Sequence, residues 1–460
     1  MTLIKSISGI RGTIGGSAGD NLTPLDVVKF TSAFAHILKQ NSKNDKLTFI
    51  VGRDARISGL MVESIVVATL SGMGINVINT GLSTTPTVEM EVIRRRADGG
   101  IILTASHNPK QWNALKLLNE KGEFISADLG AQVLELADSQ NFDFTDVDNL
   151  GTISTYENSI QDHIDDILKL PLVDKDLIKN AGFKVVVDAV NSTGGISIPQ
   201  LLDALGVENV TELYCDPTGE FPHNPEPLPE NVVELCSAVK ENNADLGIVV
   251  DPDVDRLALV MENGIMFGEE YTLVAVADYI LQNTPGNTVS NMSSTRALKD
   301  VTEKLGQSYS ASAVGEVNVV DMMKATNAIV GGEGNGGVIY PELHSGRDAL
   351  VGIALILTYL AKRKIKLSEL RKTYPDYSIS KNKIDLLPNT NTQEIFDRVA
   401  TEFSEFKVST IDGIKIDFPD GWVQLRTSNT EPIMRVYAES TSMDKANKYA
   451  EDVKTVVNAK

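Results

Sequence analysis

The sequence predicts an α/β protein with three consecutive α/β domains and a C-terminal α+β domain. Three observations support this prediction. Short apolar runs of strand length alternate with helical periodicity along most of the chain. Three of these runs are followed at once by an unusual polar loop. The last part of the chain, from about residue 378, instead shows alternating segments between two helical patterns. We therefore expect mixed, mainly parallel sheets in the first three domains.

The length and composition indicate a multidomain globular protein. A chain of 460 residues is too long for one hydrophobic core, and 42% hydrophobic with 23% charged residues is typical of globular proteins. The formal net charge of -20 disfavours binding to nucleic acid or to an anionic membrane surface. Neither a run of about 18 apolar residues nor a secretory pattern occurs, and two cysteines are too few for a disulfide framework. We expect a cytoplasmic protein.

The first predicted domain, residues 1–155, alternates helices and strands. Thr23 and Pro24 are a typical N-cap and first-turn proline, and apolar residues at helical spacing follow them. The apolar runs predict buried strands, and the last of them leads into Ala-Ser-His-Asn-Pro. The predicted elements are a helix from residue 24, a strand at 47–51, a helix at 60–70, a strand at 75–78, a helix at 88–95 and a strand at 99–104.

Two more α/β domains are predicted at 156–257 and 258–375. A strand at 246–250 leads into Asp-Pro-Asp-Val-Asp-Arg, and a strand at 328–330 leads into a glycine-rich segment at 331–337. Open parallel sheets bind ligands at the carboxyl ends of their strands, so the three loops could converge on one cleft. The fourth domain, 376–460, is predicted to contain helices at 393–403 and 444–457 and strands at 414–418, 423–425 and 434–437.

Three carboxylates alternate in the loop after the second-domain strand. Asp251, Asp253 and Asp255 would repel one another unless a cation binds them, and their hard oxygen ligands suit Mg²⁺. The spacing also resembles the start of a calcium EF-hand loop, but no glycine stands at its sixth position and no glutamate at its twelfth. A solvated acidic turn remains the alternative, and the position directly after an apolar strand speaks against it.

The loop after residue 104 places Ser106 beside His107. A serine hydrolase would show a Gly-x-Ser-x-Gly elbow, and the flanking glycines are missing. The same short pattern is also typical of a helix N-cap followed by proline. Whether this serine is catalytic therefore has to be judged together with the other polar loops.

Two further segments are suited to a phosphorylated sugar. Arg426, Ser428, Asn429 and Thr430, with Arg435 nearby, concentrate groups that bind a phosphate monoester, although serine, asparagine and threonine are also common in ordinary turns. The glycine-rich segment allows close backbone approach, and Glu333 and Asn335 within it offer hydrogen-bonding groups to sugar hydroxyls; a flexible hairpin is the alternative.

Two segments supply local positive charge within this acidic chain. Arg11 stands among three glycines near the N-terminus, and Gly52-Arg-Asp-Ala-Arg56 follows the first buried strand. Exposed arginines are usually only solubilising. Together with the serine and aspartate loops, however, they favour a site for an anionic substrate.

Taken in order, five segments resemble the signature series of the α-D-phosphohexomutases. They are Gly9-Ile-Arg-Gly-Thr13, Thr104-Ala-Ser-His-Asn-Pro109, Asp251-Pro-Asp-Val-Asp-Arg256, Gly332-Glu-Gly-Asn-Gly336 and Arg426-Thr-Ser-Asn-Thr-Glu-Pro432. The resemblance spans essentially the whole chain. It implies a heart-shaped, four-domain phosphotransferase that moves a phosphoryl group within a sugar phosphate through a phosphoserine and a bisphosphorylated intermediate.

The resemblance also implies a role for each matching residue. Ser106 would carry the phosphate and, with the three aspartates, bind Mg²⁺. Lys116 would be a proton-transfer candidate beside Arg11 and Arg256, and His107 stands in the same catalytic loop. The substrate-binding candidates are Gly315, Glu316, Glu333, Asn335, Arg426, Ser428, Asn429, Thr430 and Arg435. A sugar 1,6-bisphosphate would act as activator.

Departures from the family pattern bear on the substrate. Gly337 replaces a histidine that some members use, and Pro252 and Val254 stand where glycines are common. The Glu-Gly-Asn-Gly-Gly form is similar to that of archaeal-type phosphoglucosamine mutases, which favours glucosamine phosphate over mannose or glucose phosphate. A non-catalytic phosphosugar-binding protein and a metal-dependent phosphatase are the alternatives. We expect a monomer or homodimer.

Overall fold

The computed structural model describes residues 2–6, 9–387, 390–428 and 433–458. These residues form two compact units. Unit 1 comprises residues 1–272 and 336–368, and unit 2 comprises residues 273–335 and 369–460. The chain thus passes from one unit to the other three times, and each unit is described by itself.

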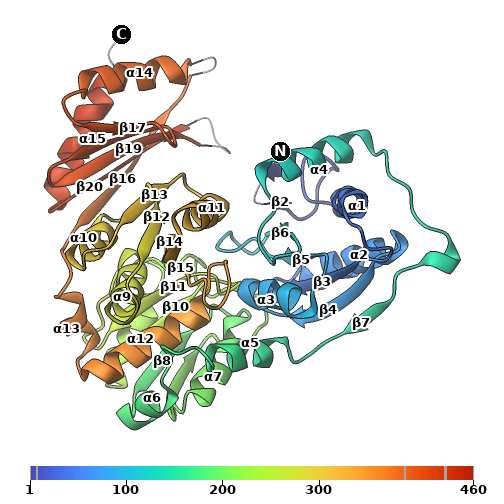
Figure 1. Cartoon of the computed structure of the whole chain (residues 1–460), viewed down its shortest axis with the longest axis horizontal. Helices are drawn as coiled ribbons and strands as arrows, with labels where there is room; N and C mark the ends of the chain where they lie inside the picture. Colours follow the sequence, from blue (N-terminus) through green and yellow to red (C-terminus); the bar gives the residue numbers. More distant parts are fainter. Residues whose placement is uncertain (1, 7–8, 388–389, 429–432, 459–460) are drawn as a thin grey trace. The chain divides into compact units, whose positions relative to one another are not determined.

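The first part of unit 1 contains a mixed sheet of seven strands (Figure 1). Its central strands are parallel, and the strands on one side of them pair antiparallel. The strand order is β1 (Ile4–Ser6), β2 (Gly9–Thr13), β6 (Trp112–Leu118), β5 (Gly99–Leu103), β3 (Thr48–Arg53), β4 (Asn76–Leu82) and β7 (Ile153–Thr155). Strand β6 was not predicted from the sequence, and it places Lys116 beside β5 in the sheet.

Helices complete this part and bury its core. The predicted helix start at Pro24 is confirmed: Thr23 N donates to Asp26 Oδ2 at 3.1 Å in a capping box. The ring of Phe34 lies 5.5 Å from that of Phe49, centroid to centroid, within the apolar core. The helices are α1 (Pro24–Asn41), α2 (Gly59–Gly72), α3 (Thr85–Arg95) and α4 (Ala127–Ser139), followed by the 3-10 turn η1 (Val147–Asn149).

A second sheet of unit 1 delivers the aspartate loop. Its order is β11 (Leu257–Met261), β10 (Leu246–Val250), β8 (Lys184–Asp188) and β9 (Asn209–Leu213), with only β11 antiparallel to its neighbour. Every residue of β10 and β11 is buried, as the continuous apolar runs indicate. The associated helices are α5 (Ser159–Ile167), α6 (Lys175–Ala181), α7 (Gly194–Ala204) and α8 (Val233–Glu241).

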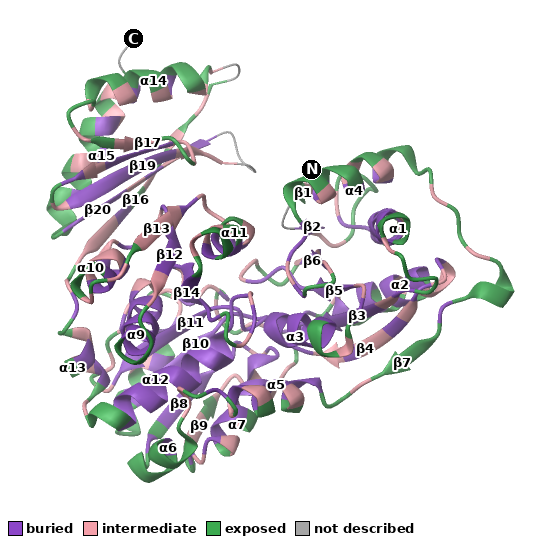
Figure 2. Ribbon diagram, viewed as in Figure 1, coloured by how far each residue is buried: buried purple, intermediate pink, exposed green. Residues whose placement is uncertain are grey.

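Residues 336–368 return the chain to unit 1. They contain β15 (Gly337–Ile339) and α12 (Ala349–Arg363), which packs against α5, α6 and α7. Helix α12 is buried along most of its length, from Ala349 to Ala361 (Figure 2). A helix that is apolar all round belongs in a protein interior, and this one closes the core of unit 1.

Unit 2 holds two sheets. Strands β13 (Tyr309–Ser312), β12 (Asn287–Asn291) and β14 (Ala328–Glu333) are parallel and accompany α10 (Ala297–Lys304) and α11 (Glu316–Thr326). The C-terminal sheet is antiparallel, in the order β16 (Ser378–Asp385), β20 (Ile433–Ser440), β19 (Gly421–Thr427), β18 (Ile414–Phe418) and β17 (Lys407–Ser409). Helices α14 (Thr392–Glu402) and α15 (Met443–Asn458) belong to this sheet, whereas α9 (Glu269–Asn283) and α13 (Leu367–Arg371) span unit boundaries.

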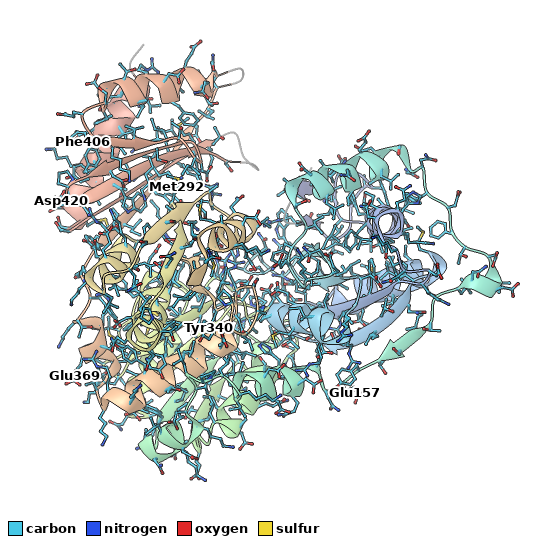
Figure 3. All side chains as sticks on the ribbon, viewed as in Figure 1. Glu157, Met292, Tyr340, Glu369, Phe406 and Asp420 are labelled. Carbon is cyan, nitrogen blue, oxygen red and sulfur yellow. The ribbon has the colours of Figure 1, made fainter. Side chains whose placement is uncertain are left out.

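Buried polar contacts join the two sheets within unit 2. Lys415 Nζ donates to the carbonyl of Met292 at 2.7 Å and lies 4.3 Å from the ring centroid of Trp422. Met292 is labelled in Figure 3. Glu439 Oε1 accepts from Trp422 Nε1 at 2.8 Å and from the amide of Arg296 at 2.9 Å. Burial lowers the pKa of Lys415 to about 8. Among the described residues, no helix is long and apolar enough to cross a membrane.

Candidate active site

Ser106 stands in the loop that follows β5, in a backbone conformation that is rare for a residue with a side chain. Its φ is 48°, in the left-handed region. The amide of Ser106 donates to Thr104 Oγ1 at 2.9 Å, and its hydroxyl donates to Asp251 Oδ2 at 2.6 Å. The side chain is therefore aimed at the aspartate loop of the second sheet.

Arg56 fixes the serine loop through the loop's backbone carbonyls. Its guanidinium donates to four backbone carbonyls of that loop, those of Ser106, Asn108, Pro109 and Trp112. Arg56 Nε also donates to Asp54 Oδ2 at 3.0 Å, and Thr104 Oγ1 donates to the same oxygen at 2.6 Å. Arg56 is only 1% exposed. From the sequence, this arginine is expected to supply positive charge to an anion site, whereas in the structure it fixes the loop that carries Ser106.

Hydrogen bonds from other segments to its backbone carbonyls hold the aspartate loop in place. Val254 has a φ of 64°, an unfavourable conformation for a β-branched residue. Hydrogen-bond donors from other segments bond the carbonyls of this loop. The hydroxyls of Ser192 and Thr193 donate to the carbonyl of Pro252 at 2.6 and 2.9 Å. The Thr85 amide donates to the carbonyl of Asp253 at 2.9 Å, and the Ala349 amide to that of Val254 at 3.2 Å. These partners offset the strain of a loop that lacks glycine.

The three aspartates form a buried cluster in which two carboxylate oxygens have no hydrogen-bond partner. One carboxylate oxygen from each lies within 4.8 Å of the others. Asp253 Oδ2 accepts from Thr85 Oγ1 at 2.6 Å and from Lys116 Nζ at 2.7 Å, and Asp255 Oδ2 accepts from Arg347 Nη2 at 2.6 Å. In contrast, Asp253 Oδ1 and Asp255 Oδ1 are buried without a hydrogen-bond partner. Buried oxygens of this kind fit a hard divalent cation.

The pKa values of Asp251 and Asp253 are shifted in opposite directions. Burial, together with the charges of Asp255 and Asp253, raises the pKa of Asp251 well above its usual value. Burial also opposes ionisation of Asp253, but Lys116 outweighs it and lowers the pKa of that carboxyl. Burial lowers the pKa of Lys116, yet Asp253 and Asp255 raise it by more, so the ammonium keeps its proton.

Arg256 and Arg11 lie close to each other and to His107, the residue after Ser106. Arg256 Nε lies 3.9 Å from Asp251 Oδ2 and 3.7 Å from Asp255 Oδ1. Burial and the nearby Arg256 lower the pKa of Arg11, which stands on β2. His107 Nδ1 lies 3.4 Å from Ser106 Oγ. Arg256, burial and Arg11 lower the pKa of His107 to about 2, so its imidazole is neutral.

The sugar-binding candidates lie in unit 2. Glu333 Oε1 accepts from Asn291 Nδ2 at 2.8 Å and from the amide of Gly315 at 3.1 Å, which brings together two predicted residues that are distant in the sequence. Gly315 is the N-cap of α11 with a φ of 112°, and Glu316 begins that helix. Asn335 is half-buried at the end of the same glycine-rich segment.

The phosphate-binding candidates lie at the ends of two paired strands. Arg426 on β19 is opposite Arg435 on β20, and both are half-buried. The amide of Ser428 donates to the carbonyl of Ile433 at 2.9 Å. Arg426 Nε is buried without a hydrogen-bond partner. Asn429 and Thr430, which belong to the same prediction, lie outside the described residues.

Two residues that contact the aspartates, Thr85 and Arg347, were not predicted from the sequence. Thr85 follows the helix N-cap Thr84, and the pattern Thr-Thr-Pro could have indicated a helix start at that point. Arg347 precedes Asp348, the N-cap of α12. The order Arg-Asp before an apolar helix shows the cap, but no local signal shows that the arginine reaches Asp255.

Four profiles of known protein families match successive parts of the chain. They describe the α/β/α domains I, II and III of phosphoglucomutase/phosphomannomutase, at residues 3–143, 161–264 and 268–377, and the C-terminal domain at 386–456. The chain belongs to the phosphoglucomutase/phosphomannomutase family. It is thus a phosphohexomutase, an isomerase that transfers a phosphoryl group, and the predicted superfamily and fold class are confirmed.

Relatives of this phosphohexomutase match over almost their whole length. A phosphoglucomutase/phosphomannomutase of Thermococcus kodakarensis is 36% identical, with 96% of each chain covered. A phosphoglucosamine/phosphogalactosamine mutase of Sulfurisphaera tokodaii is 31% identical, with 98% of each chain covered. The crystal structure of a phosphoglucomutase/phosphomannomutase family protein from Burkholderia thailandensis superposes with a TM-score of 0.86 at 25% identity, covering 99% of this chain and 98% of that one.

Proposed function

We propose that this phosphohexomutase is a phosphoglucosamine mutase that interconverts glucosamine 6-phosphate and glucosamine 1-phosphate through Ser106. The observation that carries the proposal is the 2.6 Å hydrogen bond from Ser106 Oγ to Asp251, beside two buried carboxylate oxygens without partners. A serine in that position can carry a phosphate and receive it back without a strongly basic neighbour. Phosphoryl transfer depends mainly on positioning and on neutralising charge.

The reaction would proceed in two transfers. A free sugar hydroxyl attacks the phosphorus of phosphorylated Ser106; the P–Oγ bond breaks, and a bisphosphorylated sugar forms. After this intermediate has turned around, Ser106 Oγ attacks its other phosphate and the second P–O bond breaks, which leaves an isomerised monophosphate and restores the phosphoserine. Lys116, whose ammonium holds its proton, would give that proton to the departing serine oxygen and take up the proton that the attacking sugar hydroxyl releases, and the second transfer would run the same exchange in reverse. Arg11 and Arg256 would stand beside the transferring group and neutralise its charge. Neutral His107 would accept a hydrogen bond next to it.

Asp251, Asp253 and Asp255, with an oxygen on Ser106, would hold Mg²⁺. The orphaned oxygens of Asp253 and Asp255 support this assignment. When bound, the cation would neutralise part of the phosphate charge. A sugar 1,6-bisphosphate would serve as activator, because it phosphorylates Ser106 when the intermediate is lost.

Residues of unit 2 would select the substrate. We assign the sugar hydroxyls to Glu333 and Asn335 with Gly315 and Glu316, and the non-reacting phosphate to Arg426, Ser428 and Arg435, together with Asn429 and Thr430. The Glu-Gly-Asn-Gly-Gly segment, which resembles that of phosphoglucosamine mutases, favours glucosamine phosphate. The relatives named phosphoglucosamine mutase support it as well. The runner-up is a phosphomannomutase/phosphoglucomutase, which the name of the T. kodakarensis relative favours.

A substrate comparison tests the proposal. Purified protein is incubated with Mg²⁺, a catalytic amount of glucose 1,6-bisphosphate and, separately, glucosamine, glucose or mannose 6-phosphate. We expect the fastest interconversion with glucosamine 6-phosphate. Faster turnover of glucose or mannose phosphate would replace the proposed substrate, and no interconversion of any of the three would refute the mutase.

Intact mass separates the mutase from a non-catalytic phosphosugar-binding protein, and an assay of released phosphate separates it from a phosphatase. We expect a phosphate adduct on the wild type that disappears in Ser106→Ala and persists in Ser64→Ala, a control serine that is exposed on α2. A phosphosugar-binding protein without catalysis would carry no adduct. A phosphatase would release inorganic phosphate in place of the isomerised sugar.

We also propose the four domains 1–155, 156–257, 258–375 and 376–460, a cytoplasmic location, and a monomer or homodimer. The four family profiles, whose gaps fall close to these boundaries, support the division. Light scattering on the purified protein would determine the oligomeric state.

A further inference from the structure

Arg347 reaches the aspartate cluster from a segment with no recognised catalytic motif. Its Nη2 donates to Asp255 Oδ2 at 2.6 Å, and Lys116 Nζ lies 3.5 Å from the same oxygen. The other oxygen, Asp255 Oδ1, has no hydrogen-bond partner. Arg347 is only 7% exposed. The guanidinium thus bonds one oxygen of the carboxylate, while the other oxygen makes no hydrogen bond and has the Arg256 Nε, 3.7 Å away, as a charged neighbour.

A buried polar cluster lies next to Arg347 in the chain. Asp348 Oδ2 lies 2.9 Å from His163 Nε2 and 3.4 Å from His344 Nε2, while its Oδ1 caps α12. On the far side of the ring, His344 Nδ1 lies 3.4 Å from Glu89 Oε2. Hydrogen bonding and charge from Asp348 and Glu89 outweigh burial and raise the pKa of His344 to about 10. His344 is therefore a charged link between two carboxylates.

The cluster connects three segments: α3, α5 and residues 344–349. Residues of the first and the third also form hydrogen bonds with the aspartate loop. Glu89 lies one turn along α3 from Thr85, which bonds the backbone and the side chain of Asp253. Asp348 lies between Arg347, which bonds Asp255, and Ala349, whose amide bonds the carbonyl of Val254. His163 belongs to α5 and also contacts Thr87 Oγ1 at 2.9 Å through Nδ1. The loop that includes Tyr340, labelled in Figure 3, leads to His344, whose amide donates to the Tyr340 carbonyl.

We propose that Arg347 is a positioning residue for the cation site, and that Glu89, His163, His344 and Asp348 hold it there. It fixes Asp255 through Oδ2, so that Oδ1 faces the cation. The inference rests on the proposed function, since it assigns a role in binding the divalent cation. A partner that orients a metal ligand typically changes metal affinity or activity by about 10- to 100-fold when it is removed.

The alternative is that Arg347 only balances charge, and the two roles predict opposite results. Removing a cation from beside three carboxylates makes the site more negative and favours binding of a divalent ion. Losing the planar, directional grip of a guanidinium on Asp255 instead weakens binding, even when the charge is kept. Lysine and glutamine at this position separate these effects.

The experiment measures Mn²⁺ binding by electron paramagnetic resonance without any sugar, and the Mg²⁺ dependence of turnover. The proteins are the wild type, Arg347→Lys, Arg347→Gln and the control Arg371→Gln. Arg371 also donates to a carboxylate at 2.6 Å, that of the exposed Asp376. We expect both Arg347 variants to bind Mn²⁺ about 10- to 100-fold more weakly, with the KM for Mg²⁺ raised and the KM for the sugar phosphate unchanged, and the control to match the wild type.

Wild-type affinity in Arg347→Lys together with tighter binding in Arg347→Gln would overturn the inference in favour of charge balance. Absence of Mn²⁺ binding by the wild type would overturn it as well. A wild type that binds Mn²⁺ but interconverts no sugar phosphate would refute the proposed function alone. His344→Gln, which removes the charged link and leaves Arg347 in place, is expected to weaken Mn²⁺ binding too. Unchanged binding in a folded His344→Gln protein would refute the role of the cluster.

Discussion

Replacing Arg56 by lysine tests whether the serine loop is held by a single guanidinium. The side chain makes five hydrogen bonds, one to Asp54 and four to carbonyls of the loop. Lysine keeps the positive charge but has three donors on one nitrogen. At least two buried acceptors therefore lose their donor, and each loss costs about 1–3 kcal/mol. We expect a total of about 2–6 kcal/mol.

This energy can be lost in two ways, and one set of measurements detects both. If the loop shifts locally, Ser106 leaves its position and turnover falls by about 30-fold to about 20,000-fold, at about 1.4 kcal/mol for each factor of ten. If the loop keeps its place, the free energy of unfolding falls instead. Mutase rates and urea unfolding are measured for Arg56→Lys and for Arg53→Lys. Arg53 is the matched control, because it is paired mainly with Glu63 through Nε at 2.6 Å. Equal rates and stabilities of the two variants would refute the reasoning.

Three further predictions concern the cation, pH and a close contact. Mg²⁺ at about a hundred times its dissociation constant should stabilise the wild type by about 2.7 kcal/mol in thermal unfolding; Asp251→Asn should lose this gain, and a gain of equal size would contradict the site. The pKa of His344 is raised from 6.5 to about 10, so its stabilising contribution is complete below 6.5 and is lost as the pH rises through about 10. Urea unfolding across this range should show a larger loss for the wild type than for His344→Gln, and parallel curves would disprove the charged link. In Gly346→Ala the new Cβ would lie 1.9 Å from Glu89 Oε2, which should destabilise the protein. The control Gly72→Ala, whose new Cβ would lie 3.5 Å from Phe144 Cδ1, should be neutral or stabilising in the same thermal scan.

The sequence predicted the fold where local patterns determine it. The helix beginning at Pro24 and the strand at 246–250 follow from capping and from a continuous apolar run, and the structure contains both. Strand β6 was missed because its alternation is weak and its partners β2 and β5 are distant in the sequence. Pairing of that kind is a tertiary property.

The candidate site shows the same division between local and distant information. Three alternating aspartates are unusual enough to predict a cation site from sequence alone, and the structure places their oxygens within reach of one another. Arg347 and Thr85 were missed, because each reaches the aspartates from a segment far away in the chain. The left-handed conformation of Val254 was also unpredictable, since its sequence neighbours do not favour it and the hydrogen bonds that hold the loop come partly from distant segments.

The threefold passage of the chain between its units has a consequence for synthesis. A nascent chain that has emerged only to residue 272 already contains Ser106 and all three aspartates, but it lacks α12, Arg347 and the amide of Ala349. The ribosome adds about 5–20 residues per second, so the aspartate loop lacks the donors Arg347 and Ala349 for several seconds. Until the segment up to residue 368 has emerged, the apolar surfaces of α5, α6 and α7 that α12 covers stay exposed. Unit 1 is therefore completed only after most of the first sheet of unit 2 has been made, so the surroundings of Ser106 are completed late although the residue itself is made early.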